Sequence, residues 1–350
     1  MGAQDSRRRD ARVRLRARSG ERPVSAEIAV VAATHNRCVR LAALLDALRA
    51  QTIGAERFEV VIVDDASSDG TRELLADAAQ RGDLALTVLR HDTSRGPAVA
   101  RNAGWRTARA PLVAFTDDDC RPSPGWLEAG IRALAATANG GGEAIVQGLT
   151  EPDPAEAHRL GPFTRSLNVP GLDHWYATAN MFYWRATLER LGGFDETTFS
   201  RPGGEDTDLA WRAIGDGVPT AFSEEARVWH AVHELGALQR LRFATRWDET
   251  MAVFGRYPEL RRLTLIRGLF WKESHYHLAR TLAGLLLPGR LRLIGAYFAY
   301  RYALLLWRRA HWHGDGKGGG PLLVPYYLAE NVIELATAVR GAARYRTPVL

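Results

Sequence analysis

Three consecutive carboxylates, Asp117, Asp118 and Asp119, directly follow a run of strand-forming residues, Leu112 to Thr116. Like charges this close together repel each other, so something must compensate them. A hard divalent cation such as Mn²⁺ or Mg²⁺, which prefers oxygen ligands, would do this. The alternative is a solvated acidic turn, because carboxylates are common on loops. Which of these two interpretations holds, a metal site or a solvated turn, depends on the elements that position the three residues.

Short strand patterns alternate with helical patterns from Ile28 onward, which is typical of βαβ units and a parallel sheet. The chain has four expected strands, at Ile28–Ala33, Phe58–Val63, Leu84–Leu89 and Leu112–Thr116. The helices between them are expected at Arg40–Ala50, Thr71–Gln80 and Gly96–Thr107. The sequence therefore predicts an α/β domain whose sheet is flanked by helices.

Polar residues follow three of these strands: Thr34 and Asn36, then Asp64 and Asp65, then the three aspartates. Right-handed crossovers place these loops at one edge of the sheet, where α/β proteins bind ligands. Neither GxGxxG nor GxxxxGK[ST] occurs in the chain, so a metal ion must take over the binding of any phosphate. For Asn36 and Asp64, capping of a turn is the alternative role.

Composition sets the outer limits on what the protein can be. With 350 residues, of which 46% are hydrophobic and 25% charged, the chain reads as a soluble globular protein of one large or two smaller domains. Its two cysteines, Cys38 and Cys120, define neither a disulfide framework nor a zinc site. We therefore expect a cytoplasmic protein.

Charge is distributed unevenly along the chain. Residues 1–22 carry a net charge of +5, residues 23–235 carry −10 and residues 236–350 carry +11. Because the basic residues flank an acidic middle and form no single basic patch, we do not expect nucleic-acid binding. The basic, aromatic-rich C-terminal part suits an anionic membrane surface better.

Six motifs resemble, in sequence order, those of the family 2 glycosyltransferases, which have the GT-A (nucleotide-diphospho-sugar transferase) fold. They are VVAATHNR at Val30–Arg37, FEVVIVDDASSDGT at Phe58–Thr71, RGPAVARNAG at Arg95–Gly104, FTDDDC at Phe115–Cys120, LGGFDE at Leu191–Glu196 and GGEDTDLAWR at Gly203–Arg212. The resemblance covers about residues 26–232. It implies a Rossmann-like, mostly parallel sheet flanked by helices, with a C-terminal helical extension. The expected organisation is a disordered basic arm at 1–25, a GT-A catalytic domain at 26–235 and a helical extension at 236–350.

The resemblance implies a metal-dependent transferase that moves a sugar from a nucleotide-diphospho-sugar (UDP-, GDP- or dTDP-linked) to an acceptor hydroxyl. Asp117 and Asp119 occupy the outer positions of the family's DXD motif, with Asp119 the expected direct ligand of Mn²⁺ or Mg²⁺. His230 stands where several relatives have a third metal ligand, and His233 competes for that role. The residues expected to bind the nucleotide sugar are Thr34, Asn36, Arg37, Asp64, Asp65, Arg95, Asn102, Asp117 and Asp118.

Glu205 and Asp206 follow two glycines and begin a helical pattern, where negative charge is favoured. By the resemblance, Asp206 is the general base and Glu205 orients or supports the acceptor. Attack opposite the diphosphate would invert the anomeric centre in a single displacement. The alternative for Asp206 is helix capping without chemistry. The residues expected to line the acceptor site are Trp175, Asn180, Gly193, Phe194, Asp195 and Trp211, although Trp175 could equally belong to the core.

Helical patterns rich in Arg, Trp, Tyr and Leu fill the chain beyond residue 236. The most apolar run, Leu293–Trp307, has fifteen residues and contains Arg301, which is short of the ~20 residues that cross a bilayer. It could lie in the membrane interface or pack as a helical subdomain, with oligomer contact as a further option. We expect a flexible connector at Gly314–Pro321 and a last helix at Tyr326–Arg340.

Two other functional classes were weighed. A sugar-phosphate nucleotidyltransferase would need a Gly-rich signature containing lysine near the first strand, and no lysine precedes Lys272. A membrane-associated scaffold with a lost active site would not need acids in all of these loops. A metal-dependent inverting glycosyltransferase remains the leading expectation, either free in the cytoplasm or peripheral on the inner face of the membrane.

Overall fold

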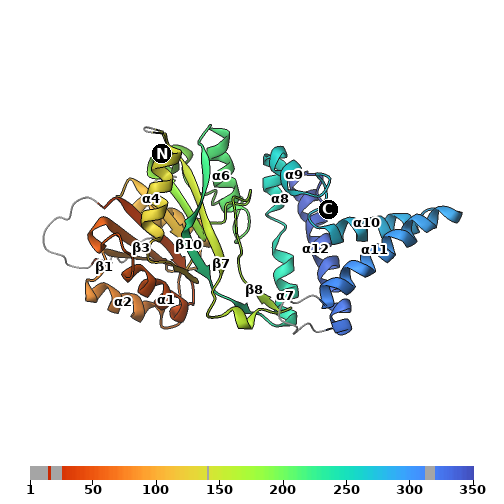
Figure 1. Cartoon of the computed structure of the whole chain (residues 1–350), viewed down its shortest axis with the longest axis horizontal. Helices are drawn as coiled ribbons and strands as arrows, with labels where there is room; N and C mark the ends of the chain where they lie inside the picture. Colours follow the sequence, from red (N-terminus) through yellow and green to blue (C-terminus); the bar gives the residue numbers. More distant parts are fainter. Residues whose placement is uncertain (1–14, 17–25, 140–141, 312–319) are drawn as a thin grey trace. The chain divides into compact units, whose positions relative to one another are not determined.

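The computed structural model describes residues 15–16, 26–139, 142–311 and 320–350, which divide into two compact units (Figure 1). Unit 1 comprises residues up to Ala157 together with Ser166–Ala231, and unit 2 comprises His158–Arg165 and Val232–Leu350. Most of the expected basic arm lies outside the described residues. Leu15 and Arg16 are described, and they form a short strand, which differs from the disorder expected there.

Unit 1 is built on a nine-stranded sheet with the order β1-β4-β3-β2-β5-β9-β7-β10-β6. Its strands are β1 (Leu15–Arg16), β2 (Ile28–Thr34), β3 (Phe58–Asp64), β4 (Leu86–Arg90), β5 (Leu112–Thr116), β6 (Cys120–Pro122), β7 (Ile145–Pro152), β9 (Asn180–Trp184) and β10 (Thr220–His230). The neighbours β4, β3, β2 and β5 are parallel, which confirms the expected βαβ arrangement. Strand β9 runs antiparallel to both β5 and β7, so the sheet is mixed.

Helices cover both faces of this sheet (Figure 1). They are α1 (Cys38–Arg49), α2 (Thr71–Arg81), α3 (Pro97–Thr107), α4 (Trp126–Thr137), α5 (Arg185–Leu191) and α6 (Glu205–Gly215). Alternate residues such as Val30 and Val60 belong to the hydrophobic cluster that includes residues of α1, α2 and α4. Val31 and Val63 point to the other face, where they lie close to Gly104 of α3.

The register of the parallel strands brings their carboxyl ends together. Thr34 pairs with Asp64, and the backbone amide of Asp65 donates a 2.8 Å hydrogen bond to the carbonyl of Thr34. Strand β5 lies on the other side of β2 and ends at Thr116, immediately before the three aspartates. The loops that carry the expected ligands therefore share one edge of the sheet.

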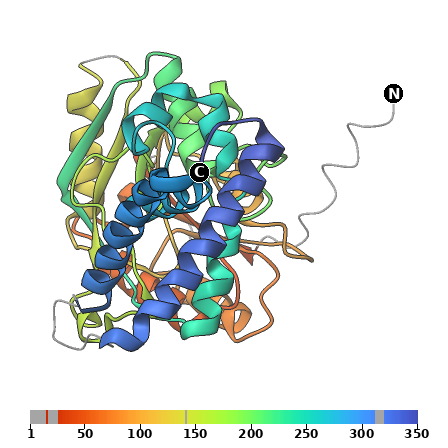
Figure 2. The same cartoon turned by 90° about the vertical axis from the view of Figure 1, so that its right-hand side faces the viewer.

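Unit 2 contains a two-stranded sheet, β8 (Thr164–Arg165) with β11 (His233–Glu234), and a set of helices. The helices are α7 (Ala237–Phe243), α8 (Met251–Arg256), α9 (Pro258–Thr264), α10 (Glu273–Leu285), α11 (Arg292–His311) and α12 (Leu323–Tyr345), coloured from teal to blue in Figure 2. Short 3₁₀ turns occur at Ala55–Arg57, Ala157–Arg159, Ala244–Arg246, Gly289–Leu291 and Gly320–Leu322. The predicted last helix lies inside α12, whereas Gly314–Gly319 of the predicted connector lies outside the described residues.

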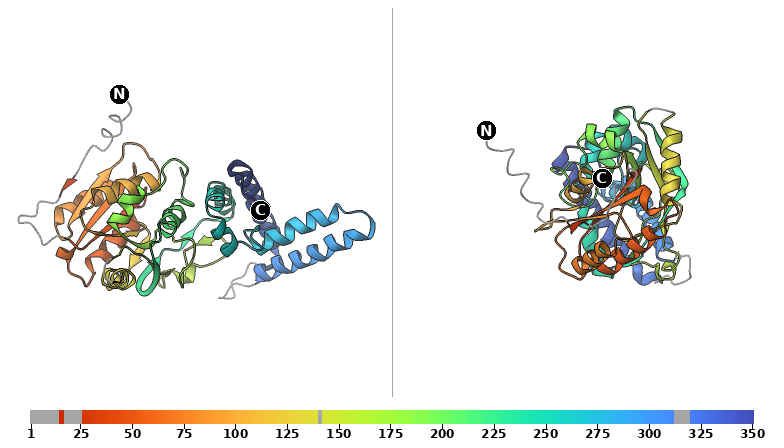
Figure 3. Two further views of the ribbon diagram at one scale, coloured as in Figure 1. Left: turned by 90° about the horizontal axis from the view of Figure 1, so that it is seen from above. Right: turned by 90° about the vertical axis from the view of Figure 1, so that its left-hand side faces the viewer.

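Helices α10 and α11 form an antiparallel hairpin whose turn lies away from α12 (Figure 3). The helices approach closely because Gly284 faces Gly295: a Cβ atom on Gly284 would lie 2.5 Å from the Cα of Gly295. A small core that includes Leu278, Tyr302 and Tyr327 joins this hairpin to α12.

Within the described chain, Gly320–Tyr345 alone is long and apolar enough to cross a membrane, by length and composition. Its hydropathy of 1.2 is low, and 39% of the apolar window is already buried within the protein. It also carries Glu330 and Glu334, which are buried and ion-paired. We read α12 as a packed helix of unit 2.

Candidate active site

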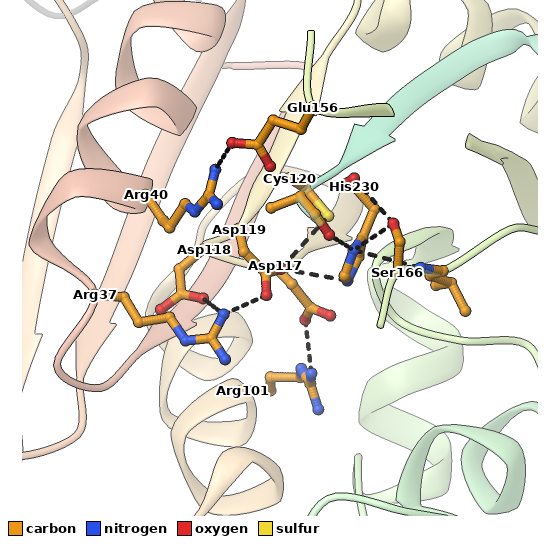
Figure 4. Close-up of polar contacts among 12 residues, drawn as sticks. Arg37, Arg40, Arg101, Asp117, Asp118, Asp119, Cys120, Glu156, Ser166 and His230 are labelled. Atoms are coloured by element: carbon orange, nitrogen blue, oxygen red, sulfur yellow. Dashed lines mark hydrogen bonds and ion pairs between the residues drawn. The ribbon is translucent and has the colours of Figure 1, made fainter. Parts of the chain in front are cut away.

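The three aspartates after β5 are held by two arginines from neighbouring elements (Figure 4). Arg37, in the loop after β2, forms an ion pair with Asp119 and lies 3.8 Å from Asp118. Arg101, on α3, contacts Asp117 at 2.8 Å. This cluster is therefore not the solvated turn that was the alternative explanation of the motif.

Asp118 is buried, with 6% of its surface exposed. Burial, and then the adjacent charge of Asp119, raise the pKa of Asp118 to about 7, although Arg37 opposes this shift. Three carboxylates in one buried loop thus remain short of positive charge even with both arginines in place.

Asp119, Cys120 and His230 form a group whose potential ligand atoms lie within 4.8 Å of one another (Figure 4). The group exists because β6 pairs antiparallel with β10, which places His230 opposite Cys120. Nε2 of His230 lies 3.6 Å from a carboxylate oxygen of Asp119. Burial raises the pKa of the Cys120 thiol well above its usual value. Sulfur is also a soft ligand, whereas Mn²⁺ and Mg²⁺ prefer oxygen.

The surroundings of His230 fix the orientation of its ring. Nδ1 makes its shortest contact, 2.8 Å, with the backbone carbonyl of Ala231, and the amide of Leu167 lies 3.4 Å from the same nitrogen. In the tautomer with its proton on Nδ1, this proton is donated to Ala231 and the lone pair of Nε2 points toward the carboxylate of Asp119. A cation between these two groups satisfies both, and a backbone carbonyl on the second nitrogen is the usual support of a metal-binding histidine. The residues present therefore fit a divalent metal ion.

The second acidic pair lies at the start of α6. Gly204, with φ of 116°, allows the chain to turn into the helix, and Glu205 is buried immediately after it. Glu205 accepts hydrogen bonds from the amide of Gly203 at 2.8 Å and from Nη1 of Arg101 at 3.0 Å. Its carboxylate is thus committed to protein partners.

Asp206 is in a different situation from Glu205. Its polar contacts are the backbone amides of Thr207 at 2.9 Å and Thr178 at 3.4 Å. Burial, and then the charge of Glu205, raise the pKa of Asp206 to about 7, against the opposing charge of Arg101. A carboxylate with a pKa near neutrality suits a general base.

Arg101 joins the two acidic groups, and the sequence reasoning missed it. One nitrogen of its guanidinium contacts Asp117 and the other contacts Glu205. The side chain is buried, and these carboxylates hold the pKa of Arg101 above its ordinary value despite burial. The signal was present in the motif RGPAVARNAG, where Arg101 precedes Asn102.

Residues expected to contact the nucleotide occupy the loops after β2 and β3. Asp64 is ion-paired with Arg90 and accepts a hydrogen bond from the amide of Ser67. Asn36 has φ of 54° and connects the two loops, because its Oδ1 accepts from the amide of Ser68 at 2.7 Å. Both residues therefore also act as the turn caps that were considered as alternatives.

Asp65 is almost fully engaged by the protein. Its carboxylate accepts hydrogen bonds from His91, Ser94 and the backbone amides of Arg95 and Gly96. Burial would raise the pKa of Asp65, but these hydrogen bonds lower it to about 2. Asp65 therefore anchors the loop that leads into α3, and its expected contact with the nucleotide sugar stays a prediction.

Two of the expected ligand-binding asparagines are structural. Asn102 is buried, accepts from the amide of Phe194 and donates to its carbonyl. Asn180 accepts from Nε1 of Trp126 and donates to two backbone carbonyls. An asparagine with both ends satisfied inside the core cannot bind a substrate without losing these bonds. In the structure both residues connect parts of the fold, and a role for either in binding a ligand stays a prediction.

Three other expected acceptor residues lie in the segment between α5 and α6. Phe194 is buried against Phe115, and Asp195 caps the turn at Thr197 and Thr198. Gly193 has φ of 78° and packs against Asn102 and Trp105. These three residues support α3 in the folded chain.

Two tryptophans contact α6 and its adjacent loop. The carbonyl of Trp175 accepts a hydrogen bond from the hydroxyl of Thr207, and Nε1 of Trp211 donates to the carbonyl of His174. Trp175 is half-buried, whereas Trp211 is buried. His233, the competitor of His230 for the metal, lies in β11 of unit 2.

Comparison with known proteins shows which proteins this chain is similar to. Residues 29–192 match the family described as Glycosyl transferase family 2. Validoxylamine A glucosyltransferase of Streptomyces hygroscopicus subsp. jinggangensis is 32% identical over 240 residues, which cover 59% of this chain and 56% of that protein. The chain thus spans about half the length of that relative. Glycosyltransferase AglE of Haloferax volcanii is 27% identical over 260 residues, covering 71% of this chain and 83% of AglE.

The fold is also shared with a solved structure, the mannosyltransferase PcManGT from Pyrobaculum calidifontis in complex with GDP-Man and Mn²⁺. The TM-score is 0.57 at 23% identity, and the match covers 90% of this chain and 88% of PcManGT. The mixed, mostly parallel sheet with flanking helices and a C-terminal helical region is the GT-A arrangement, so the predicted fold is confirmed.

Proposed function

We propose that this chain, whose residues 29–192 match the family 2 glycosyltransferases, transfers a sugar from a nucleotide-diphospho-sugar to an acceptor hydroxyl with a divalent metal ion bound. We further propose a single displacement that inverts the anomeric centre. One observation carries this proposal: Arg101 contacts both Asp117 and Glu205, so the acids after β5 and the acids of α6 form one site. The nucleotidyltransferase and scaffold alternatives are not favoured by the comparisons.

Asp119 and His230 are the residues that we propose to hold the metal ion, with Asp117 as an additional carboxylate. The bound ion would act as a Lewis acid that neutralises the negative charge of the departing diphosphate. Mn²⁺ or Mg²⁺ suits a set of carboxylates and one imidazole, and the solved structure of similar fold contains Mn²⁺. Arg37, beside Asp118 and Asp119, would place a further positive charge at the diphosphate.

Asp206 is the proposed base. Its carboxylate accepts the proton of the acceptor hydroxyl, and the oxygen of that hydroxyl forms a bond to the anomeric carbon of the donor sugar. The bond from that carbon to the diphosphate breaks, and the nucleoside diphosphate leaves with the electron pair. Glu205 and Arg101 hold α6 so that Asp206 keeps its place.

The donor end of the site consists of the loops after β2 and β3, where Thr34, Asn36 and Asp64 lie. A nucleotide placed there would direct its diphosphate toward the three aspartates at the end of β5. The donor could carry UDP, GDP or dTDP. The solved structure of similar fold holds GDP-Man, which makes GDP-mannose the first donor to try.

A donor screen tests this proposal directly. We would incubate the full chain with UDP-, GDP- and dTDP-sugars, each with Mn²⁺, Mg²⁺ or EDTA, and measure release of the nucleoside diphosphate. The proposal predicts release from one donor class only when metal is present. Release at an equal rate in EDTA, or from no donor with either metal, would contradict it.

Unit 2 offers a surface for membrane contact, and we propose that the hairpin of α10 and α11 lies on the anionic cytoplasmic face of a membrane. Its large exposed apolar residues are Leu282, Leu285, Leu286, Leu291, Leu293, Ile294, Tyr297, Tyr300 and Trp307. The sequence from Ser274 to Gly314 contains no Asp or Glu, whereas Arg290 and Arg292 follow the turn. Apolar side chains with arginines beside them suit the boundary between headgroups and acyl chains.

A further inference from the structure

Unit 2 contains a cavity of about 140 Å³ that the proposed transfer reaction does not use. All of its lining residues belong to unit 2, and they come from β8, α7, α8, α10, α12 and the segments between them. The volume is close to that of an engineered cavity of about 150 Å³ that holds benzene. The cavity can therefore take one six-membered ring.

One wall of the cavity is aromatic. The rings of Trp247 and Trp271 lie 5.8 Å apart at an angle of 45°, and Phe243 meets Trp247 edge-on at 5.6 Å. All three side chains line the cavity. Aromatic faces of this kind attract the C–H bonds on the flat face of a sugar ring.

Charged side chains form much of the rest of the wall, together with Ala244, Met251 and Ala338. Arg165 lies 4.5 Å from the centre of the Phe243 ring, and the other charged groups are ion-paired. Nζ of Lys272 contacts the two carboxylate oxygens of Glu334 at 2.6 and 2.8 Å. Glu330 contacts Arg309 at 2.7 Å and Arg240 at 3.4 Å. Paired charges leave the cavity polar without a strong net charge, which suits a neutral ligand with many hydroxyl groups better than a phosphate.

One buried polar atom in the wall lacks a partner within the described part of the chain. His275 is 2% exposed, its Nδ1 has no hydrogen-bond partner, and its Nε2 lies 3.4 Å from Glu334. Buried polar atoms are normally satisfied, so exceptions in a cavity wall indicate a ligand with donors and acceptors.

We propose that this cavity is a carbohydrate-binding site that holds one sugar ring, with the ring stacked on Trp247 and Trp271 and its hydroxyl groups bonded to His275 and Glu330. The site is additional to the transfer site, and it does not depend on the reaction proposed for unit 1. It would give the enzyme a second point of attachment to a glycan.

The test measures quenching of tryptophan fluorescence by methyl α-D-glucopyranoside, methyl α-D-mannopyranoside and inorganic phosphate. It uses the full chain in EDTA, so that binding is observed without the metal-dependent reaction. We expect saturable quenching by at least one glycoside. Replacing Trp247 with Ala should weaken this binding at least about tenfold, whereas Trp247→Phe, which keeps an aromatic face, should lose less.

Matched controls separate this site from the others. Trp307→Ala removes an exposed tryptophan of α11 and should leave binding unchanged, as should Asp206→Asn in unit 1. Glu330→Gln keeps the shape of the wall and should weaken binding even if Trp247→Ala fails to fold. No saturable binding of either glycoside, binding of phosphate alone, or equal binding by wild type, Trp247→Ala and Glu330→Gln would overturn the proposal. If the wild type binds a glycoside in this cavity but transfers no sugar, that result would count against the function proposed for unit 1 and not against the cavity.

Discussion

Asp65, Asp118 and Asp206 carry the same carboxyl group, yet their pKa values differ by several units. Four hydrogen-bond donors bring the pKa of Asp65 to about 2, whereas burial and a neighbouring carboxylate bring those of Asp118 and Asp206 to about 7. A carboxylate held by donors is suited to anchoring a loop. One with a raised pKa can accept a proton near neutral pH.

Asp206→Asn should lower kcat by about 10²–10⁴ and leave donor affinity nearly unchanged, because the amide cannot accept the proton of the acceptor. The wild-type rate should rise as pH increases through about 7, since only the deprotonated form of Asp206 is active. Steady-state kinetics between pH 5 and 9 measure both effects, and Asp216→Asn, at the opposite end of α6, is the control. An unchanged kcat in Asp206→Asn would exclude Asp206 as the base.

Arg101→Met should destabilise the protein by about 3–5 kcal/mol, because the buried Glu205 and Asp117 both lose the arginine with which they pair. The value of kcat should fall as well, since α6 loses its link to the loop that carries the three aspartates after β5. Denaturant unfolding and kcat would be compared with those of Arg106→Met, a more exposed arginine on the same helix that pairs with Glu196. Equal effects of the two substitutions would show that Arg101 is not the bridge.

At the scale of elements, the position of α3 depends on a close approach to the sheet. Gly104 of α3 lies so near to β2 that a Cβ atom on it would be 2.5 Å from Cγ1 of Val31. This approach places Arg101, one turn earlier on the helix, between the loop after β5 and α6. Packing of a helix against a strand therefore sets the geometry of the site.

Gly104→Ala should cost about 1–3 kcal/mol of stability, because the added methyl group overpacks the interface between α3 and the sheet. Gly215→Ala is the matched control: it is also helical, and a Cβ atom there meets nothing within 4 Å, so it should be neutral or stabilising. Urea unfolding measures the free energy of unfolding of both variants. If Gly104→Ala is as stable as Gly215→Ala, α3 is free to shift and the close approach is not a constraint.

At the scale of the whole molecule, unit 1 carries the proposed chemistry, and unit 2 carries the proposed membrane surface and sugar cavity. The hairpin of α10 and α11 exposes leucines on both sides of its turn, including Leu286, which is 86% exposed. Exposed apolar residues beside arginines, with no acid between Ser274 and Gly314, are the basis for the proposed contact with an anionic bilayer.

The membrane surface predicts co-flotation of the protein with vesicles that contain phosphatidylglycerol, and weaker flotation with phosphatidylcholine alone. The double variant Leu286→Asp/Leu291→Asp should lose flotation, because it places charge in the apolar turn. Leu238→Asp, on the exposed side of α7, should not. Equal flotation of all three proteins, or none by the wild type, would refute this role of the hairpin.

Much of the fold of unit 1 could be predicted, because its elements follow the local period of apolar residues. The strands at Ile28 and Phe58 and the helix at Thr71 lie where expected. The position of β9 could not be predicted in this way, since its antiparallel pairing with β5 joins residues far apart in sequence. No local pattern encodes that contact.

The candidate site was predictable where residue type alone sets the chemistry, as for the acids after β5 and at the start of α6. It was not predictable where burial decides the role. Asn102 and Asn180 look like ligand-binding residues in sequence, yet tertiary contacts use all of their polar atoms. Arg101 shows the converse, because its two partners come from distant segments that only the fold brings together.

Calorimetric titration of nucleoside diphosphate, with Mn²⁺ and with EDTA, tests the central claim most directly. The wild type should bind only with the metal present, and Asp119→Asn and His230→Ala should each lose that binding by about tenfold or more. His158→Ala, an exposed histidine outside the site, should bind like the wild type. Nucleotide binding of equal strength in EDTA, or unchanged in both Asp119→Asn and His230→Ala, would contradict the metal site proposed here.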